Sequence, residues 1–540
     1  MLAKDLEPGS NPKHARSIPF WRMVVDQGAI TQDILDYPYP GSGSEHDPFV
    51  VSWIPDDARN PMRFSVWRKI MITVTVSIAT LVVSIGSSAY SGSIQQVIDY
   101  FDINNEVATL GLSLFVIGFA LGPLFWAPLS EFIGRQLPFF VSFGIMAALL
   151  AGCAGADTIY GLLILRFFAG AFGSAPLTNS GGVISDMFPP EQRGLALSLF
   201  AAAPFMGPAL GPVIGGFLGM NAGWRWVEGF LAAFAGLLWI LMTLLVPETY
   251  APVLLRRRAE RLSYLTGKVY RTRLDIDAEG GRSLKRMFGM SLLRPWILLF
   301  REPIVLALSI YIAIVYGALF MMFGAFPIVY QEVRGWNEGI GGLAFMGIMI
   351  GMIIAVGYTI PDNKRYMKVL KKYNGFAPPE SRLPPVILAS VCIPVGLFWF
   401  AWTNGPSIHW LCSIAACVPF GFGIILIYLG TLSYLIDSYT IYAASVLAAN
   451  AVMRSSFGAI FPLFTTYMYR GLGIHWASSI PAFLTVLCMP FPFLFYKFGK
   501  SIRKRCKYAA ESEAHMQKLQ QCSKGPEVNV KQVEETLKDG

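Results

Sequence analysis

Twelve stretches of mostly apolar residues, each long enough to cross a lipid bilayer, restrict the fold of this chain more than any other feature. Crossing about 30 Å of hydrocarbon takes about 20 such residues in a helix. Only helices and closed barrels satisfy their own backbone hydrogen bonds in lipid, and the alternating segments of about ten residues that are typical of a barrel do not occur. The sequence therefore predicts an all-α polytopic membrane protein with twelve transmembrane helices. The predicted spans are 69–89, 109–129, 137–156, 159–180, 195–218 and 224–246, then 304–326, 340–360, 385–403, 409–435, 442–469 and 474–496.

Composition excludes most soluble and enzymatic alternatives. Hydrophobic residues make up 54% of the 540 residues and charged residues only 14%, against roughly 25% charged in a soluble domain. The five histidines are scattered without ligand spacing. Gly499-Lys500-Ser501 resembles the end of a phosphate-binding loop, but Leu494 occupies the position of its first glycine. We therefore expect neither an ATP-driven pump nor an enzyme, with no catalytic residue, metal or cofactor.

Positive charge alternates between the predicted loops. The net charge is +9, and Lys and Arg concentrate before Ile70, between spans six and seven, and in 362–384. Segment 90–106 holds three acidic residues and no Lys or Arg. Since cytoplasmic loops carry the Lys and Arg excess, both termini are predicted to be cytoplasmic. The basic residues are divided among loops beside the membrane, which favours contact with anionic lipid over a nucleic-acid surface.

The longest polar interruption divides six spans from six. An acid followed by a base also recurs after the second span of each half, as Glu131 with Arg135 and as Asp362 with Arg365. This layout predicts two pseudo-symmetric six-helix bundles that rock about a site near the membrane midplane. The predicted division is a cytoplasmic N-terminal tail 1–68, an N-terminal bundle 69–246, a basic cytoplasmic linker 247–303, a C-terminal bundle 304–496 and a cytoplasmic C-terminal tail 497–540.

The loop after the second span contains a candidate conformational latch. Glu131 and Arg135 lie one helical turn apart or face each other across Gly134, so they can pair with each other and oppose a neighbouring helix end. Such a pair can break and re-form as the halves move. An ordinary loop ion pair, worth about 0–1 kcal/mol, is the alternative interpretation.

Few charges lie inside the spans, and Arg166 is the deepest in the first half. It lies about 10 Å from the outer end of the fourth span at 1.5 Å per residue. An arginine at that depth must be paired or face water, and ionisable residues inside membranes are usually functional. We predict that Arg166 controls the protonation of a nearby carboxylate. Glu228 is a candidate proton carrier, although it could equally be the structural partner of Arg225 or of Arg166.

The fifth span carries glycine every fourth residue, with prolines between. Small residues at this spacing allow close helix approach, and proline removes backbone donors and bends a helix. A kinked, smooth helix suits a gating interface, and a plain packing face is the alternative. The residues of this gating-helix prediction are Gly207, Pro208, Gly211, Pro212 and Gly215.

The substrate is predicted to bind between the halves among aromatic and polar side chains of the second half. Arg454 lies near the middle of the eleventh span, where it is either part of a cavity or a structural link to another helix. The other predicted cavity residues are Tyr311, Tyr316, Phe320 and Asn450.

These motifs together resemble the major facilitator superfamily, and within it the fungal twelve-span drug:proton antiporters. The loop after span two, the arginine of span four and the glycine–proline pattern of span five are each similar to signatures of that family. Further similar motifs are Trp224-Arg225-Trp226, Pro247-Glu248-Thr249-Tyr250-Ala251-Pro252 and Asp437-Ser438-Tyr439-Thr440-Ile441-Tyr442. The likeness covers roughly 65–500, and it departs from the wider superfamily in carrying Glu131 where Asp is usual and Gln136 where a second base is common.

The resemblance implies a plasma-membrane antiporter, most simply a monomer, that exports drugs, toxins, polyamines or secondary metabolites by alternating access. Protons and one small-molecule substrate would be its partners besides the bilayer, with the proton gradient as energy source. The alternative is a proton-coupled importer or a uniporter of the same fold. Only the likeness of the span-five motif favours export.

Overall fold

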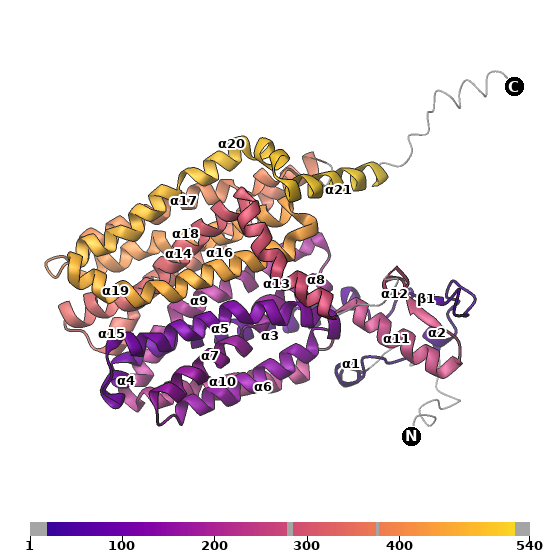
Figure 1. Ribbon diagram of the computed structural model, residues 1–540, viewed down its shortest axis with the longest axis horizontal. Coiled ribbons are helices and arrows are strands. Elements are labelled where there is room, and N and C mark those ends of the chain that lie inside the picture. The colour runs from indigo at the N-terminus through magenta and orange to yellow at the C-terminus, as the bar shows by residue number, and fades with distance from the viewer. Residues whose placement is uncertain (1–18, 278–283, 374–376, 524–540) are drawn as a thin grey trace, which may run out of the picture.

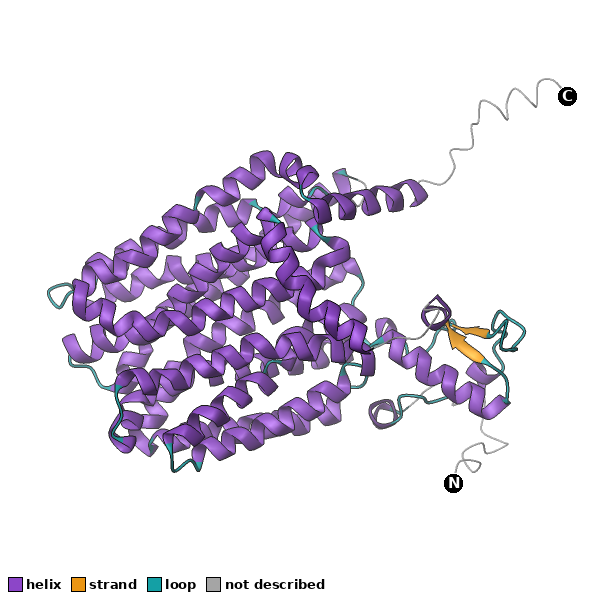
Figure 2. Ribbon diagram, in the orientation of Figure 1, coloured by secondary structure: helices purple, strands orange, loops and turns teal. Residues whose placement is uncertain are grey.

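Two bundles of helices lie side by side in the computed structural model, the first indigo to magenta and the second orange to yellow (Figure 1). The structure describes residues 19–277, 284–373 and 377–523. Helices dominate this part of the chain, and the strands lie in a small group of segments beside one end of the bundles (Figure 2). The all-α class predicted from the sequence is confirmed.

The first bundle makes six crossings, each within a few residues of a predicted span. Helix ends follow local signals: Asn104 caps the helix that follows it by accepting a hydrogen bond from the Val107 amide at 3.1 Å, and that helix stops at Gly134, where φ is 103°. The fourth crossing consists of two consecutive helices, α7 and α8. The elements are α3 (Val66–Ser88), η2 (Ala89–Ser93), α4 (Ile94–Phe101), α5 (Asn105–Ile133), α6 (Gln136–Ala154), α7 (Ile159–Gly173), α8 (Ala175–Met187), α9 (Pro190–Ala222) and α10 (Trp224–Leu245).

The second bundle repeats this plan and contains much of the largest apolar core. Most of α14 is buried, because it packs inside its own bundle and also faces the first one. The elements are α14 (Pro303–Phe326), η3 (Pro327–Val333), α15 (Glu338–Leu343), α16 (Met346–Lys372), η4 (Pro379–Arg382), α17 (Pro384–Thr403), α18 (Trp410–Ser438), η5 (Thr440–Tyr442), α19 (Ala443–Cys488) and α20 (Pro490–Arg505).

Helix α19 contains two crossings. Among the described residues, 11 helical segments are long and apolar enough to span a membrane, and one of them runs from Thr440 to Arg505. Its helical geometry breaks at Gly473, where φ is 75° and ψ is 163°. The hydroxyls of Tyr469 and Ser478 then lie 2.8 Å apart, whereas nine residues of continuous helix would separate them by about 13 Å. The chain therefore turns back at Gly473, which completes the twelve predicted crossings.

The segments before the first bundle and between the bundles fold together at one end, which we call the basic end (Figure 1). Strand β1 pairs in parallel with β2, and Arg258 forms a 2.6 Å ion pair with Asp57, with 3% and 2% of the two side chains exposed. The sequence places the tail and the linker in separate regions, so this association is a feature that only the structure reveals. The elements are α1 (Phe20–Val25), α2 (Gln32–Leu35), β1 (Phe49–Val51), η1 (Pro61–Arg63), α11 (Ala251–Thr266), β2 (Tyr270–Thr272), α12 (Arg273–Asp277), α13 (Leu284–Arg301) and, after the second bundle, α21 (Lys507–Ser523).

Candidate functional site

The two bundles touch at the end opposite the basic end, which we call the far end. A cavity of about 10 Å³ between Pro212, Phe326 and Glu338 has room for about one water molecule. Among the described residues, the hydrogen bonds that join the bundles also lie toward the far end, so the structure is closed there. They connect Gln96 with Glu338 at 2.9 Å, Asn105 with Thr466 at 3.0 Å and Ser113 with the carbonyl of Ala459 at 2.7 Å.

Helix α9 lies between the bundles and uses two faces. A methyl group added at Gly207, Gly211 or Gly215 would overlap Ser84, Ser88 or Ala89 of the first bundle. The predicted glycine face therefore packs inside its own bundle, as the alternative interpretation holds. The neighbouring face meets the second bundle: a Cβ atom at Gly342 would lie 2.6 Å from the carbonyl oxygen of Pro212. Pro208 is buried, and the helix continues through it. A gating role for these residues stays a prediction.

Arg166 and Glu228 form an ion pair inside the first bundle, with 0% and 1% of the side chains exposed. The same guanidinium donates to the carbonyl of Gly111 at 2.8 Å and to the carbonyl of Gly86 at 3.2 Å. Its charge also lies over the ring of Tyr90, 4.3 Å from the centroid. Four helices, α3, α5, α7 and α10, thus meet at one arginine. The second carboxylate oxygen of Glu228 is buried without a hydrogen-bond partner.

Arg225 takes other partners, which decides between the two arginines as the partner of Glu228, while its role as a proton carrier stays a prediction. Its guanidinium donates to the carbonyl of Ala156 at 2.9 Å and lies 3.4 Å from the carboxylate of Asp157. Arg225 is partly exposed at the far end, and Glu228 points inward one turn later. The pairing of Glu228 with Arg225 is therefore wrong, and its pairing with Arg166 is present.

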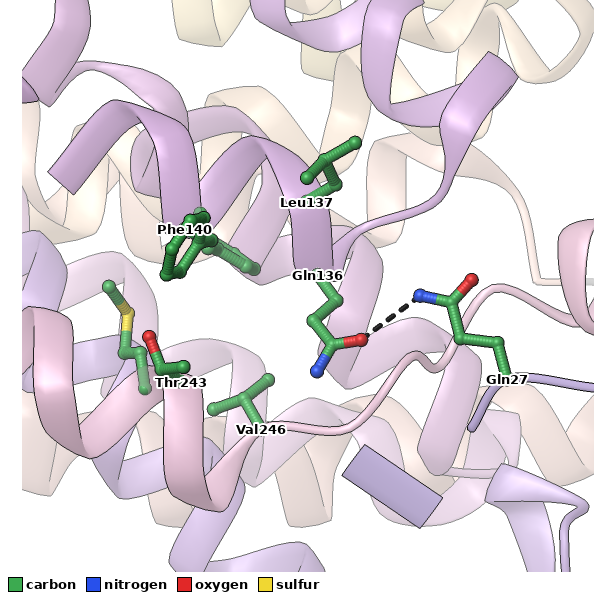
Figure 3. Close-up of a pocket in the computed structure, with 8 residues that line it drawn as sticks. Gln27, Gln136, Leu137, Phe140, Thr243 and Val246 are labelled. Carbon is green, nitrogen blue, oxygen red and sulfur yellow. Dashed lines mark hydrogen bonds between the residues drawn. The ribbon is translucent and has the colours of Figure 1, made fainter. Parts of the chain in front are cut away.

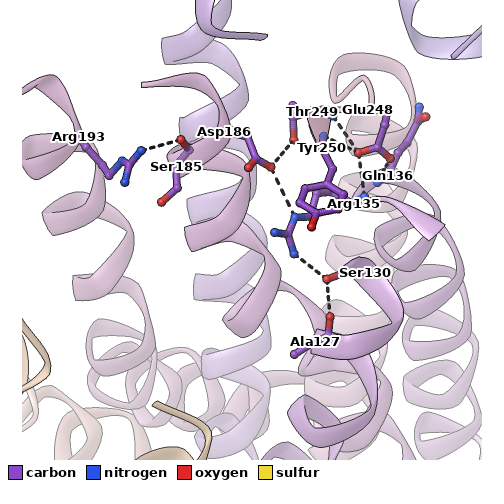
Figure 4. Close-up of polar contacts among 10 residues, drawn as sticks. All are labelled: Ala127, Ser130, Arg135, Gln136, Ser185, Asp186, Arg193, Glu248, Thr249 and Tyr250. Carbon is purple, nitrogen blue, oxygen red and sulfur yellow. Dashed lines mark hydrogen bonds and ion pairs between the residues drawn. The ribbon is translucent and has the colours of Figure 1, made fainter. Parts of the chain in front are cut away.

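The latch residue Arg135 does not pair with Glu131. Figure 4 shows its guanidinium beside Asp186, with Nε 3.5 Å from the carboxylate, while Nη1 donates to the hydroxyl of Ser130 at 2.7 Å. The Glu131 side chain is exposed and makes no ion pair in the part of the chain that the structure describes. The predicted i, i+4 pair is wrong because Glu131 lies on the outward face of α5, whereas the chain after Gly134 turns Arg135 toward α8.

Glu248, just after α10, binds the turn between α5 and α6 on the side away from Asp186. Its carboxylate accepts hydrogen bonds from the backbone amides of Arg135 at 2.9 Å and Gln136 at 3.0 Å (Figure 4). It also covers Gly134, where any Cβ atom would collide with the carboxylate and φ is 103°. Only glycine fits both the backbone angle and the space. Gly134 and Arg135 thus belong to one polar network, together with Asp186 and Glu248.

The corresponding loop of the second bundle is built differently. Arg365 pairs with Asp362 of the same helix at 2.7 Å and donates to the carbonyl of Ser381 at 3.0 Å. The acid and base that recur in the sequence therefore pair with each other in the second half only; in the first half Arg135 pairs with Asp186 of α8 in place of Glu131.

Arg454 lies at the contact between the bundles, surrounded by aromatic rings. Its guanidinium carbon is 4.8 Å from the ring centroid of Tyr316, 5.2 Å from that of Tyr428 and 5.6 Å from that of Phe205. Phe205 comes from α9 of the first bundle and packs against Tyr428, with the ring centroids 4.5 Å apart and the ring planes tilted by 60°. Phe320 packs beside Tyr316 at 4.7 Å. Three predicted cavity residues, Arg454, Tyr316 and Phe320, are thus brought together.

Two other predicted cavity residues do not join this group. Asn450 donates to the hydroxyl of Ser309 at 3.3 Å, which links two helices of the second bundle. Tyr311 is completely buried, and its hydroxyl has no hydrogen-bond partner. Tyr311 lies five residues before Tyr316 on α14, which places it on another face of that helix.

The tail at the basic end contacts the first bundle next to the latch. Gln27 donates to the side chain of Gln136 at 3.0 Å, and both line a cavity of about 140 Å³ with apolar residues of α6 and α10 (Figure 3). Arg59 is buried nearby, and this burial lowers the pKa of its guanidinium to about 10, although Glu248 raises it. This cavity lies to the side of the bundle contact and is distinct from the Arg454 group.

The fold and the site define a multi-pass membrane carrier with two pseudo-symmetric bundles. The sequence profile of the Major Facilitator Superfamily matches residues 76–462. The chain is 62% identical over 525 residues, 97% of its length and 86% of the relative, to the major facilitator superfamily multidrug transporter mdrA of Aspergillus fumigatus. It is also 62% identical over 506 residues, 94% of its length and 85% of the relative, to the MFS-type efflux pump MFS2 of Trichophyton rubrum. The chain belongs to the Major Facilitator Superfamily.

The fold also matches a solved structure. The proton:xylose symporter XylE aligns with a TM-score of 0.55 and 15% identity, over 81% of this chain and 96% of that one. This likeness concerns the fold alone. Membership of the family makes the chain a secondary transporter of small molecules and not an enzyme.

The sequence predicted the positions of the key charged residues better than it predicted the residues that contact them. Asp186 ends the fourth crossing and Glu248 lies in the Pro-Glu-Thr segment, so both come just after long apolar stretches. Acids at such positions lie at the end where Arg135 lies, and this signal could have found them. Phe205 and Tyr428 offer no comparable signal, because aromatic residues occur throughout the spans.

Proposed function

We propose that this protein is a proton-coupled antiporter that exports small organic molecules such as drugs, toxins, polyamines or secondary metabolites across the plasma membrane. The names of its relatives, a multidrug transporter and an efflux pump, support export. The basic end would face the cytoplasm, because Lys and Arg concentrate there. The chain would work as a monomer without a cofactor, with the proton gradient as its energy source.

The Arg166–Glu228 pair is the observation that carries proton coupling. It connects four helices of the first bundle through one charge, and one carboxylate oxygen remains free of hydrogen bonds. A proton placed on that carboxyl would cancel the ion pair and leave Arg166 held by two carbonyls and the rings of Tyr90 and Phe115. The packing of α3, α5, α7 and α10 would then change with the protonation state, which is the requirement for a proton to drive alternating access.

The network around Arg135 at the basic end would be the second element of the transport cycle. In this structure the far end is closed, so substrate would enter from the basic end. Arg135 connects the α5–α6 turn to α8, and Glu248 connects it to the segment after α10. Opening the far end requires the two bundles to approach each other at the basic end, and this network would keep the first bundle rigid during that motion.

The test uses plasma-membrane vesicles with the cytoplasmic face outward, so that export appears as uptake. With an acid interior, wild-type protein should accumulate dyes and antifungal drugs, and Glu228→Gln should lose at least tenfold of this gradient-driven accumulation. Asp157→Asn, which changes an exposed acid on the same bundle, is the matched control and should behave as wild type.

Three outcomes separate the alternatives. Unchanged coupling in Glu228→Gln would refute the proton role of the pair. Movement that ignores the gradient would favour a uniporter. Accumulation driven by protons moving in the same direction as the substrate would favour an importer.

A further inference from the structure

Arg454 is a buried cation without a counter-ion. Only 4% of the residue is exposed, and its Nε and Nη1 atoms have no hydrogen-bond partner. It also forms no salt bridge among the residues that the structure describes. Its position about 16 Å along α19 from Ala443 puts it near the middle of the membrane. A charge at that depth needs a partner, because neither lipid nor apolar side chains solvate it.

A structural role does not account for this arginine. Arginines that link other elements within the described chain donate to backbone carbonyls, to acids or to both: Arg334 reaches the carbonyls of Gly405 at 2.6 Å and Ile408 at 2.9 Å, Arg135 reaches Asp186, and Arg166 reaches an acid and two carbonyls. Arg454 has neither kind of contact within the described residues. Arg59 also lacks hydrogen bonds, but it lies outside the membrane spans in the field of nearby carboxylates, Glu248 among them.

The residues around Arg454 indicate the chemistry of a ligand that would fit it. Phe205, Tyr316 and Tyr428 lie within 5.6 Å of the guanidinium and come from both bundles. Aromatic rings bind flat apolar groups through stacking and burial. A guanidinium presents a planar fork that matches a carboxylate with two parallel hydrogen bonds. The combination selects a ligand that carries an aromatic or flat apolar body and one anionic group.

We propose that Arg454 is a substrate-binding residue and that the transported class includes aromatic carboxylates, bound with the carboxylate on the Arg454 guanidinium and the ring system against Phe205, Tyr316 and Tyr428, which touch one another in this structure and would part to admit it. This assignment rests on the proposed transport function. Because Phe205 belongs to the first bundle and Arg454 to the second, such a ligand would contact both bundles at once and would be released when they separate.

Equilibrium dialysis tests this assignment on the full-length protein in lipid nanodiscs, with empty nanodiscs as the blank. The probes are benzoate, 1-naphthoate and 9-anthracenecarboxylate, each compared with its neutral primary amide. At least one carboxylate should bind ten times more tightly than its amide. Arg454→Gln should reduce the affinity for that carboxylate to the level of the amide, and affinity for the amide should stay within twofold.

Two further variants keep the test decisive. Arg454→Lys retains the charge without the fork, so an intermediate preference for the carboxylate is expected even if the Gln variant does not fold. Arg225→Gln removes a partly exposed arginine at the far end and should bind as wild type does. The proposal is overturned if no carboxylate is preferred over its amide, or if Arg454→Gln weakens both forms equally. Failure of gradient-driven transport, by contrast, would refute the antiporter and leave this binding preference intact.

Discussion

The two bundles treat a buried arginine in opposite ways. Arg166 of the first bundle has an acid, two carbonyls and two aromatic rings as partners, all supplied by the bundle itself. Arg454 of the second bundle has aromatic rings only, one of them supplied by the first bundle. The pseudo-symmetric halves therefore carry out different tasks: the first contains a complete internal ion pair, and the second presents an incomplete one at the contact between the halves.

The difference shows why depth in the membrane is an insufficient guide to function. Both residues are arginines near the middle of an apolar helix, and both are almost fully buried. A charge whose partners all come from the protein stabilises one conformation. Those contacts change only when the helices move or when a partner gains or loses a proton. An unpaired charge inside the membrane, such as that of Arg454, is available to a partner from outside the protein. Substitutions at Arg166, Arg135, Arg454 and Asp157 test that contrast, in order of decreasing expected effect on stability.

Removing one member of the complete pair should have the largest effect. Arg166→Ala leaves the Glu228 carboxylate buried without its cation, which should destabilise the folded state by about 3–5 kcal/mol. The midpoint of thermal unfolding of the purified protein in detergent measures this loss. Arg166→Met combined with Glu228→Leu should recover most of the stability without recovering proton coupling. A double variant as unstable as the single one would contradict the pairing.

Substitutions in the predicted latch should lower stability by an intermediate amount at Arg135 and hardly at all at Glu131. Arg135→Ala removes contacts to Asp186 and Ser130 and should cost about 1–3 kcal/mol. Glu131→Ala, on an exposed side chain four residues earlier, should change stability by less than about 0.5 kcal/mol. Unfolding midpoints of the two variants decide the matter, and equal losses would restore the i, i+4 pair predicted from the sequence.

Removing the unpaired charge of Arg454 should lower the stability of the folded protein little or not at all. Arg454→Met replaces an unpaired guanidinium with an apolar side chain of similar length. The contacts with the rings are lost, but the burial of an unpaired charge is relieved, so stability should stay equal or rise by up to about 2 kcal/mol. The same unfolding assay measures it. A loss comparable to that of Arg166→Ala would mean that Arg454 is structural.

The exposed pair at the far end gives the smallest effect. Asp157 is 90% exposed beside Arg225, and Asp157→Asn should change stability by less than about 0.5 kcal/mol because water screens the pair. Its unfolding midpoint, measured in low and in high salt, should match that of wild type in both. A clear loss at low salt would show that even surface pairs of the first bundle are coupled to its core.

The twelve crossings could be predicted because each depends on a local quantity. About 20 consecutive apolar residues satisfy the thickness of a bilayer whatever lies elsewhere in the chain. Even the reversal at Gly473 falls between two predicted spans, 442–469 and 474–496. The sequence placed this turn, and only its backbone angles had to come from the structure. The partners of the charges could not be predicted in the same way. Arg135 finds Asp186 and Glu248 at 51 and 113 residues along the chain, and no local rule fixes such contacts.

The sequence by itself determined the class of fold, the short set of charges inside the spans and the relation to the superfamily, because hydropathy and motif spacing are read along the chain. Only the tertiary structure decided which charges are satisfied. It brought Glu228 to Arg166, turned the glycine face of α9 toward its own bundle, and left Arg454 among three rings. Whether a buried charge has a partner depends on how helices pack across the whole bundle, and that is a property of three dimensions.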